Sequence, residues 1–115
     1  MAATLTLVRR LALALPEVTE RLCHGTPTFY VRKKLMLRMW EDGETLVCKL
    51  PMELRDTLID EAPDVFSTTD HYRDYPTVLI NLNAVSPSVL ATRITAAWRE
   101  VAPAKLVAQH PTLST

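Results

Sequence analysis

The 115-residue sequence contains little glycine and little cysteine, and both scarcities exclude classes of functional site. A loop that cradles a nucleotide phosphate is built from closely spaced glycines, and the two glycines present, Gly25 and Gly43, argue against one. The two cysteines, Cys23 and Cys48, form no C-x-x-C pair, and we interpret them as small buried residues. The sequence also lacks the H-E-x-x-H and G-x-S-x-G motifs of metalloproteases and serine hydrolases.

Long hydrophobic runs are missing as well. The longest leucine-rich stretch, Leu11 to Leu15, is far shorter than the roughly 20 apolar residues that cross a bilayer. It also lacks the small-residue cleavage site of a secretory signal. The apolar fraction of 48% argues against disorder, and the length suits one domain over residues 1–115. We therefore expect a single cytoplasmic domain with no membrane partner.

Neither sign of charge is in excess over the whole chain, because 13 lysines and arginines balance 13 aspartates and glutamates. This balance argues against a strongly basic nucleic-acid-binding protein. The charges are unevenly distributed, however. Residues 21–40 contain five cations and no acid, whereas residues 51–74 contain seven acids and only two arginines. The sequence therefore predicts a positively charged region around residues 21–40 and an acidic region that follows it.

Hydrophobic periodicity predicts a mixture of helices and strands. Leu5, Val8 and Ala12 recur at helical spacing, and Ser86-Pro87 is a typical helix start. The order of elements predicts an α+β fold, a two-layer sandwich in which an antiparallel sheet of five to six strands has helices packed on one face. The predicted helices span 4–15, 51–61 and 87–101, with a tail over 104–109. The predicted strands span 17–23, 28–32, 35–40, 45–50 and 77–82, with a short one near Phe66 or Tyr72.

The strands between residues 28 and 50 are expected to form two hairpins, and the loop lengths predict which side chains share a face. A two-residue loop at Lys33-Lys34 sets Phe29 opposite Arg38, and a four-residue loop over 41–44 sets Arg38 opposite Val47. One face then carries an apolar core: Tyr30, Leu35, Leu37, Met39, Leu46, Cys48 and Leu50. The other face presents a second apolar patch: Phe29, Val31, Met36, Trp40 and Val47. Two cations, Arg38 and Lys49, lie on the same face.

An exposed patch of this kind exceeds what scattered surface hydrophobes explain, and three interpretations stay open. The strand order or the segment 64–76 covers it, it forms a homodimer interface, or nucleic-acid bases stack on Phe29 or Trp40. If DNA is the partner, the cations of the hairpin region are the expected phosphate contacts: Arg32, Lys33, Lys34, Arg38 and Lys49. The alternative for the run Arg32-Lys33-Lys34 is a solvated turn that protects a sheet edge.

The three histidines suggest no catalytic arrangement. Neighbouring side chains on a strand point to opposite faces, so Cys23 and His24 are not expected to act as a thiol and its base. His71 follows Asp70, but adjacency alone does not orient an imidazole. We therefore predict that the protein is not an enzyme and has no catalytic residue, no metal site and no cofactor. An enzyme or a small-ligand binder with a pocket near His24 and His71 is a further alternative, and the sequence leaves their convergence open.

Several stretches together resemble the MmcQ/YjbR family. The residues 24–31, which read HGTPTFYV, followed by Lys34-Leu35-Met36, are similar to its signature of a glycine-x-proline-x-phenylalanine turn and strand and then a lysine-led strand. The segments 15–18, 71–79 and 97–106 resemble later parts of the family pattern in the same order. The family commonly has a glycine before the lysine, whereas this chain has Lys33 there. A tight hairpin turn requires a positive φ at that place.

The resemblance implies a secretion-chaperone-like fold with an antiparallel sheet and helices on one side. It also implies DNA binding through a "double wing" arrangement, and it carries no catalytic residue over to this chain. We therefore expect a small non-enzymatic protein that binds DNA through its basic hairpin region. The alternative is a protein-interaction module that forms a homodimer and has no nucleic-acid role.

Overall fold

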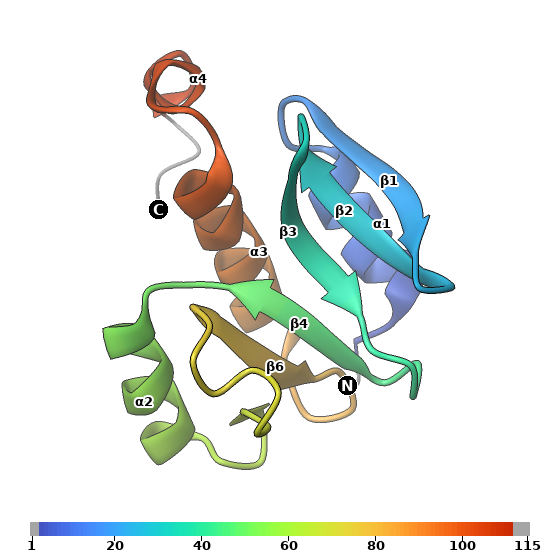
Figure 1. Cartoon of the computed structure of the whole chain (residues 1–115), viewed down its shortest axis with the longest axis vertical. Helices are drawn as coiled ribbons and strands as arrows, with labels where there is room; N and C mark the ends of the chain where they lie inside the picture. The colour runs from blue at the N-terminus through green and yellow to red at the C-terminus, as the bar shows by residue number, and fades with distance from the viewer. Residues whose placement is uncertain (1–2, 112–115) are drawn as a thin grey trace.

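The computed structural model describes residues 3–111, and over them the chain forms one six-stranded antiparallel sheet and four helices (Figure 1). The strands lie side by side in the order β1-β2-β3-β4-β6-β5. The predicted α+β class is therefore confirmed. The elements are α1 (Leu5–Leu13), β1 (Val18–Cys23), β2 (Thr26–Val31), β3 (Lys34–Met39), β4 (Thr45–Lys49), α2 (Met52–Glu61), β5 (Phe66–Ser67), β6 (Thr77–Asn81), α3 (Pro87–Val101) and α4 (Ala104–Ala108).

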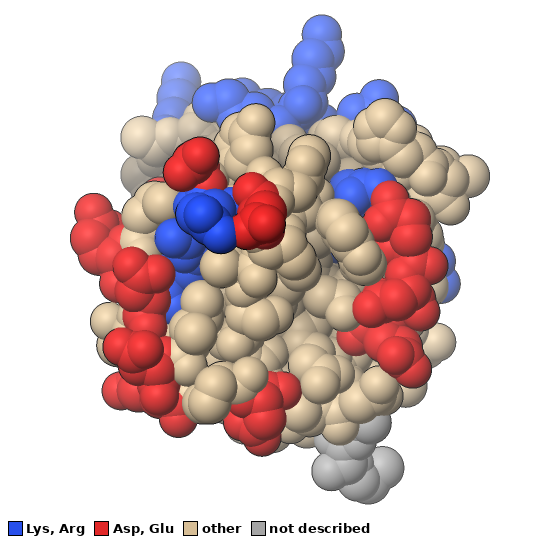
Figure 2. Space-filling view, turned by 60° about the horizontal axis from the view of Figure 1, so that its bottom comes forward, with Lys and Arg blue, Asp and Glu red and all other residues tan. Residues whose placement is uncertain are grey.

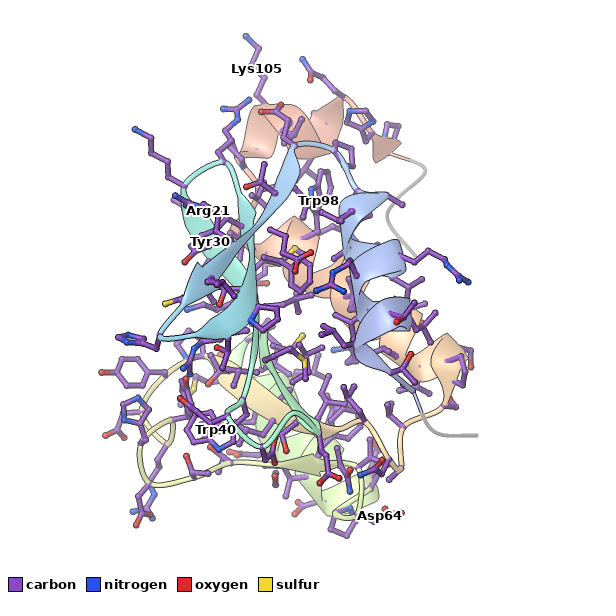
Figure 3. The ribbon with its side chains drawn as sticks, turned by 90° about the vertical axis from the view of Figure 1, so that its right-hand side faces the viewer. Arg21, Tyr30, Trp40, Asp64, Trp98 and Lys105 are labelled. Atoms are coloured by element: carbon purple, nitrogen blue, oxygen red, sulfur yellow. The ribbon has the colours of Figure 1, made fainter. Side chains whose placement is uncertain are left out.

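Two of the helices form the second layer of the sandwich. Helices α1 and α3 contact each other and pack on one face of the sheet, which we call the helix face (Figure 3). Trp98 of α3 lies fully buried between the layers, and its indole N–H donates a hydrogen bond to the Pro16 carbonyl at 2.9 Å. Helix α2 lies instead at the β5–β6 edge of the sheet (Figure 1).

Side-chain hydrogen bonds cap the first turns of α1 and α3. The Thr4 hydroxyl accepts a hydrogen bond from the Leu7 N–H at 3.2 Å, and the Ser86 hydroxyl accepts one from the Val89 N–H at 3.2 Å. Pro87 occupies the first turn of α3, as predicted. Pro51 is the N-cap of α2 and not its first helical residue, and it supplies no side-chain hydrogen bond.

Two two-residue turns connect the first three strands. His24 and Gly25 join β1 to β2, and both have positive φ (54° and 80°), as a type I′ hairpin turn requires. Arg32 and Lys33 join β2 to β3, so this turn lies one residue earlier than the predicted Lys33-Lys34 loop. The positive φ of 57° falls on Arg32 and not on Lys33.

The earlier turn changes the pairing of β2 with β3. Phe29 pairs with Leu37 instead of Arg38, and a β-bulge at Phe29/Tyr30 leaves Met36 as the extra residue of β3. A register shift of one residue moves every side chain of a strand to the other face. Phe29 and Val31 therefore pack on the helix face with exposed fractions of 0% and 1%, and Met36 is also fully buried in that core.

The predicted exposed apolar face is consequently wrong. Val47 is the one buried residue of that set on the opposite face of the sheet, and Trp40 is half-buried there. The segment 68–76 runs over this part of the opposite face (Figure 1), where the Tyr72 ring packs edge-on against Trp40 at 5.6 Å. Tyr30, predicted for the core, faces outward beneath Arg21, whose guanidinium carbon lies 4.3 Å from the ring centroid (Figure 3). An apolar sheet face open to a second copy is therefore absent from residues 3–111.

The second hairpin matches the prediction. Arg38 pairs with Val47 across a loop of residues 40–44, in which Gly43 has a positive φ of 72°. The Asp42 carboxylate accepts hydrogen bonds from the Glu44 and Thr45 N–H groups at 2.9 and 3.0 Å. These bonds stabilise the turn locally, which explains why loop length alone predicts its register.

Candidate functional site

Three of the four lysines, Lys33, Lys34 and Lys105, lie at one end of the molecule, and Lys49 lines a cavity with Lys34; we call these four residues the lysine end. Lys33 and Lys34 stand at the β2–β3 turn, and Lys105 projects from α4 at the same end (Figure 3). Lys49 is half-buried at the end of β4, while the other three are exposed. Three of the four come from the predicted phosphate-contacting set.

The bulge in β3 creates an opening at this end. The pairing of β3 with β4 covers only residues 37–39 and 46–48, so the first half of β3 separates from the last residue of β4. Bulges bend a strand and end its pairing in this way. Figure 1 shows the two strands splaying apart in front of the C-terminal half of α3.

The opening contains a shallow cavity of about 410 Å³ that joins Lys34 to Lys49. Its remaining walls are Leu35, Pro76, Glu100 and Val101. Lys34 and Lys49 come from different strands and line the same depression. The Glu100 carboxylate in its wall carries the opposite charge. Glu100 and Lys105 were not singled out from the sequence, because their approach to the hairpin depends on how α3 and α4 pack against the sheet.

Arg32 differs from the lysines because it is already paired. Its Nε and Nη2 atoms donate to the two carboxylate oxygens of Glu17 at 2.7 and 3.2 Å. The hydrogen bond from Arg32 lowers the pKa of the Glu17 carboxyl, so the pair is charged at neutral pH. No lysine of the lysine end makes an ion pair with any residue in the range 3–111.

Arg38 lies away from the lysine end, on the opposite face of the sheet, and its side chain is only 9% exposed. Its Nη2 donates to the Glu41 carboxylate at 2.7 Å, and its Nη1 donates to the Tyr72 hydroxyl at 3.4 Å. The guanidinium carbon also lies 5.7 Å from the centroid of the Trp40 ring. Arg38 therefore connects β3 to the 40–44 loop and to the segment 68–76, and it is not placed to contact a phosphate backbone.

On the face that Figure 2 shows, acidic side chains and cationic side chains occupy mostly different areas. Figure 2 brings the lower end of the Figure 1 view forward, and acidic groups flank it on both sides while Lys and Arg gather along the upper margin. In Figure 3, Asp64 and Lys105 mark opposite ends of the molecule. At the level of these two residues, acidic and basic groups are therefore separated along the molecule.

Cys48 lies apart from the other cysteine and from the histidines, because it is buried in the core. Cys48 is buried on the helix face, where its thiol donates to the Arg93 carbonyl at 3.6 Å, and burial raises its pKa to about 12. Cys23 is half-buried and lies in register with Thr26 at the other end of the sheet. His24 stands in the β1–β2 turn, and His71 packs edge-on against Tyr72 at 4.7 Å.

Metal sites and membrane spans are both absent from residues 3–111. No group of three or more His, Cys, Asp or Glu side chains there is arranged to hold a metal ion. No helix of that part of the chain combines the length and hydropathy that a membrane span requires.

Comparison with known proteins relates the chain to one family and one solved structure. The YjbR family model matches residues 13–100. The crystal structure of protein DR2400 from Deinococcus radiodurans, described as a DUF419 domain, superposes with a TM-score of 0.76. It covers 97% of this chain and 88% of that one, at 19% sequence identity, and so demonstrates a shared fold. No curated protein matches the chain.

Proposed function

The chain belongs to the YjbR family, and we propose that it binds nucleic acid through the phosphate backbone, using the lysine end. The observation that carries this proposal is the placement of Lys33, Lys34 and Lys105 at one end, with Lys49 on a cavity shared with Lys34, all four without an ion pair within residues 3–111. Lysine ammonium groups that contact phosphates release condensed counterions, which drives association without any base contact.

The zero net charge does not oppose this proposal. The molecule measures 35 Å along its longest axis, whereas the Debye length is about 8 Å at physiological ionic strength. Charges at one end are therefore largely screened from those at the other. A phosphate approaching Lys33 and Lys34 responds chiefly to nearby groups, among which the Glu17 carboxylate is already paired with Arg32.

The proposed contact is to the backbone and not to the bases. Phe29, one of the two predicted stacking residues, is fully buried in the core, and Trp40 packs against Tyr72 on the opposite face. Neither ring is available at the lysine end. Because phosphate contacts carry no sequence information directly, we expect little preference among DNA sequences.

The test is a titration of a short labelled DNA duplex at several salt concentrations. Each lysine in contact with a phosphate contributes about −0.9 to the slope of log affinity against log salt. Replacing Lys33 and Lys34 together by alanine should therefore make the slope less steep by about 1.8. Arg73→Ala is the matched control, since it removes a cation from the 68–76 segment, where Arg73 pairs with Asp70.

Absence of binding at about 50 mM salt, where phosphate contacts are strong, would refute the proposal. The proposal would also fail if Arg73→Ala changed the slope half as much as the double lysine variant, which is the same change for each charge removed. That result would mean that attraction depends on net charge alone and not on the lysine end.

A further inference from the structure

A second cavity, of about 370 Å³, lies between the start of α2, the C-terminal half of α3 and α4. It shares the Glu100 wall with the cavity of the lysine end but is otherwise separate from it. Its walls combine apolar side chains with two guanidinium groups: Leu50, Leu54, Ala96, Val107, Arg93 and Arg99. The volume falls within the range of small-molecule sites, which are typically apolar with a few polar groups.

Arg93 contributes a positively charged side chain to the wall of this cavity. Its Nη1 atom is buried and has no hydrogen-bond partner within residues 3–111. A buried donor without an acceptor is costly, more so when it carries charge. Neither Arg93 nor Arg99 forms an ion pair in that part of the chain. Nη1 itself has almost no accessible surface, so the cavity borders the rest of the half-buried Arg93 side chain, and the unpaired guanidinium charges of Arg93 and Arg99 attract an anion to it.

We propose that this cavity binds an organic carboxylate that carries a small apolar group. The two guanidinium groups of Arg93 and Arg99 match the planar carboxylate geometry, and the leucine, alanine and valine walls match the apolar group. With Glu100 included, the ionisable walls sum to a single positive charge, which favours a monoanion over a dianion. The site is independent of nucleic-acid binding, because it uses none of the four lysines.

The experiment is calorimetric titration of the full chain with hexanoate, with neutral hexanamide as the matched ligand control. Hexanoate should bind with one-to-one stoichiometry, and hexanamide at least about tenfold more weakly, because it cannot form charge-assisted bonds. Arg99→Met should weaken hexanoate binding by at least about tenfold. Arg99 is exposed, so this variant is expected to fold normally.

Two further variants sharpen the test. Arg93→Met should weaken hexanoate binding to a similar extent, and it leaves in place the Arg93 carbonyl that accepts from Cys48. Glu100→Gln should strengthen it by a few-fold, because a like charge is removed from the wall. Arg73→Met, on the segment 68–76, is the matched control and should leave the affinity unchanged.

The proposal is overturned if hexanoate and hexanamide bind equally, if hexanoate does not bind at about 10 mM, or if Arg99→Met and Arg73→Met behave alike. Binding of phenyl phosphate without binding of hexanoate would overturn the carboxylate assignment. The Lys33/Lys34 double variant should retain hexanoate affinity. Its behaviour separates a failure of this proposal from a failure of nucleic-acid binding.

Discussion

Glu17 and Arg32 face each other as two non-glycine residues that both have positive φ, 59° and 57°. Two guanidinium–carboxylate hydrogen bonds join their side chains, and the Arg32 N–H donates to the Glu17 carbonyl at 3.2 Å. Such backbone conformations are unfavourable for residues with a side chain, by about 1–2 kcal/mol each. The pair therefore holds the β2–β3 turn, with its exposed Lys33, against the connection between α1 and β1.

Releasing Arg32 should strengthen nucleic-acid binding. Glu17→Gln removes the carboxylate charge while keeping the size of the side chain, so Arg32 becomes available to a phosphate. The salt slope of duplex binding should steepen by up to about 0.9, one additional contact. Salt titration of the variant beside the unchanged chain measures this. Identical slopes would indicate that Arg32 stays out of phosphate reach even when unpaired.

Substitutions at Arg38 and Lys34 should affect different properties. The Arg38 substitution should lower the stability of the fold, and the Lys34 substitution should weaken DNA binding. Arg38→Met removes a buried guanidinium that donates to Glu41 and Tyr72, and it should lower the free energy of unfolding by about 1–3 kcal/mol. The same variant should leave the DNA salt slope unchanged. Lys34→Met should do the reverse, with stability within about 0.5 kcal/mol of the parent and a slope reduced by about 0.9.

Urea denaturation and DNA titration of both variants provide these values. A loss of DNA affinity in a folded Arg38→Met chain would restore Arg38 to the phosphate-contacting set. A loss of stability without a change in slope in Lys34→Met would remove Lys34 from it.

Truncation of the Trp98 side chain should cause one of the largest losses in the free energy of unfolding. Its side chain is fully buried between α3 and the sheet, and its indole N–H satisfies the Pro16 carbonyl. Trp98→Ala should lower the free energy of unfolding by about 3–5 kcal/mol in urea. Val89→Ala, on the exposed side of the same helix, should change it by less than about 0.5 kcal/mol. Similar losses in both variants would contradict the assigned packing of α3.

The free energy of unfolding should decrease at acidic pH, because protonation of Glu20 weakens its pairing with Arg9. Hydrogen bonds from Arg9, at 2.7 Å each, lower the pKa of Glu20 below its ordinary value of 4.5. A carboxyl with a lowered folded pKa stabilises the fold above the unfolded pKa. This stabilisation decreases as the pH falls from about 4.5 through the folded value.

The urea midpoint should therefore decline over that pH range, with Glu17, Glu41 and Asp42 contributing in the same direction. Glu20→Gln should show a shallower decline than the parent chain. A decline of equal steepness in both proteins would assign the acid sensitivity to the other carboxyls.

Most elements of the fold could be predicted because their signals are local. Ser86-Pro87 supplies a cap and a first turn, and the loop carrying Gly43 fixes the β3–β4 register. The β2–β3 register could not be predicted, since the positive φ falls on Arg32, where no glycine marks the turn. The bulge at Met36 has no sequence signature either, and together they move Phe29 and Val31 into the core.

The candidate site was predictable only in part. The run Lys33-Lys34 is visible in the sequence, and Lys49 follows from the hairpin arrangement. Lys105 lies 71 positions after Lys34, and its approach depends on α4 packing that no local pattern encodes. Arg38 shows that a positive segment can also mislead. The sequence predicts a phosphate contact there, whereas the buried side chain connects β3 to two loops.

The most direct test of the central claim compares the unchanged chain with a variant in which all four lysines are glutamine. If each lysine of the lysine end contacts one phosphate, duplex binding by the unchanged chain should show a log–log salt slope near −3.6. The quadruple variant should lose nearly all of that slope while its circular dichroism spectrum remains native. A folded quadruple variant that binds the duplex with an unchanged slope would contradict nucleic-acid binding through the lysine end.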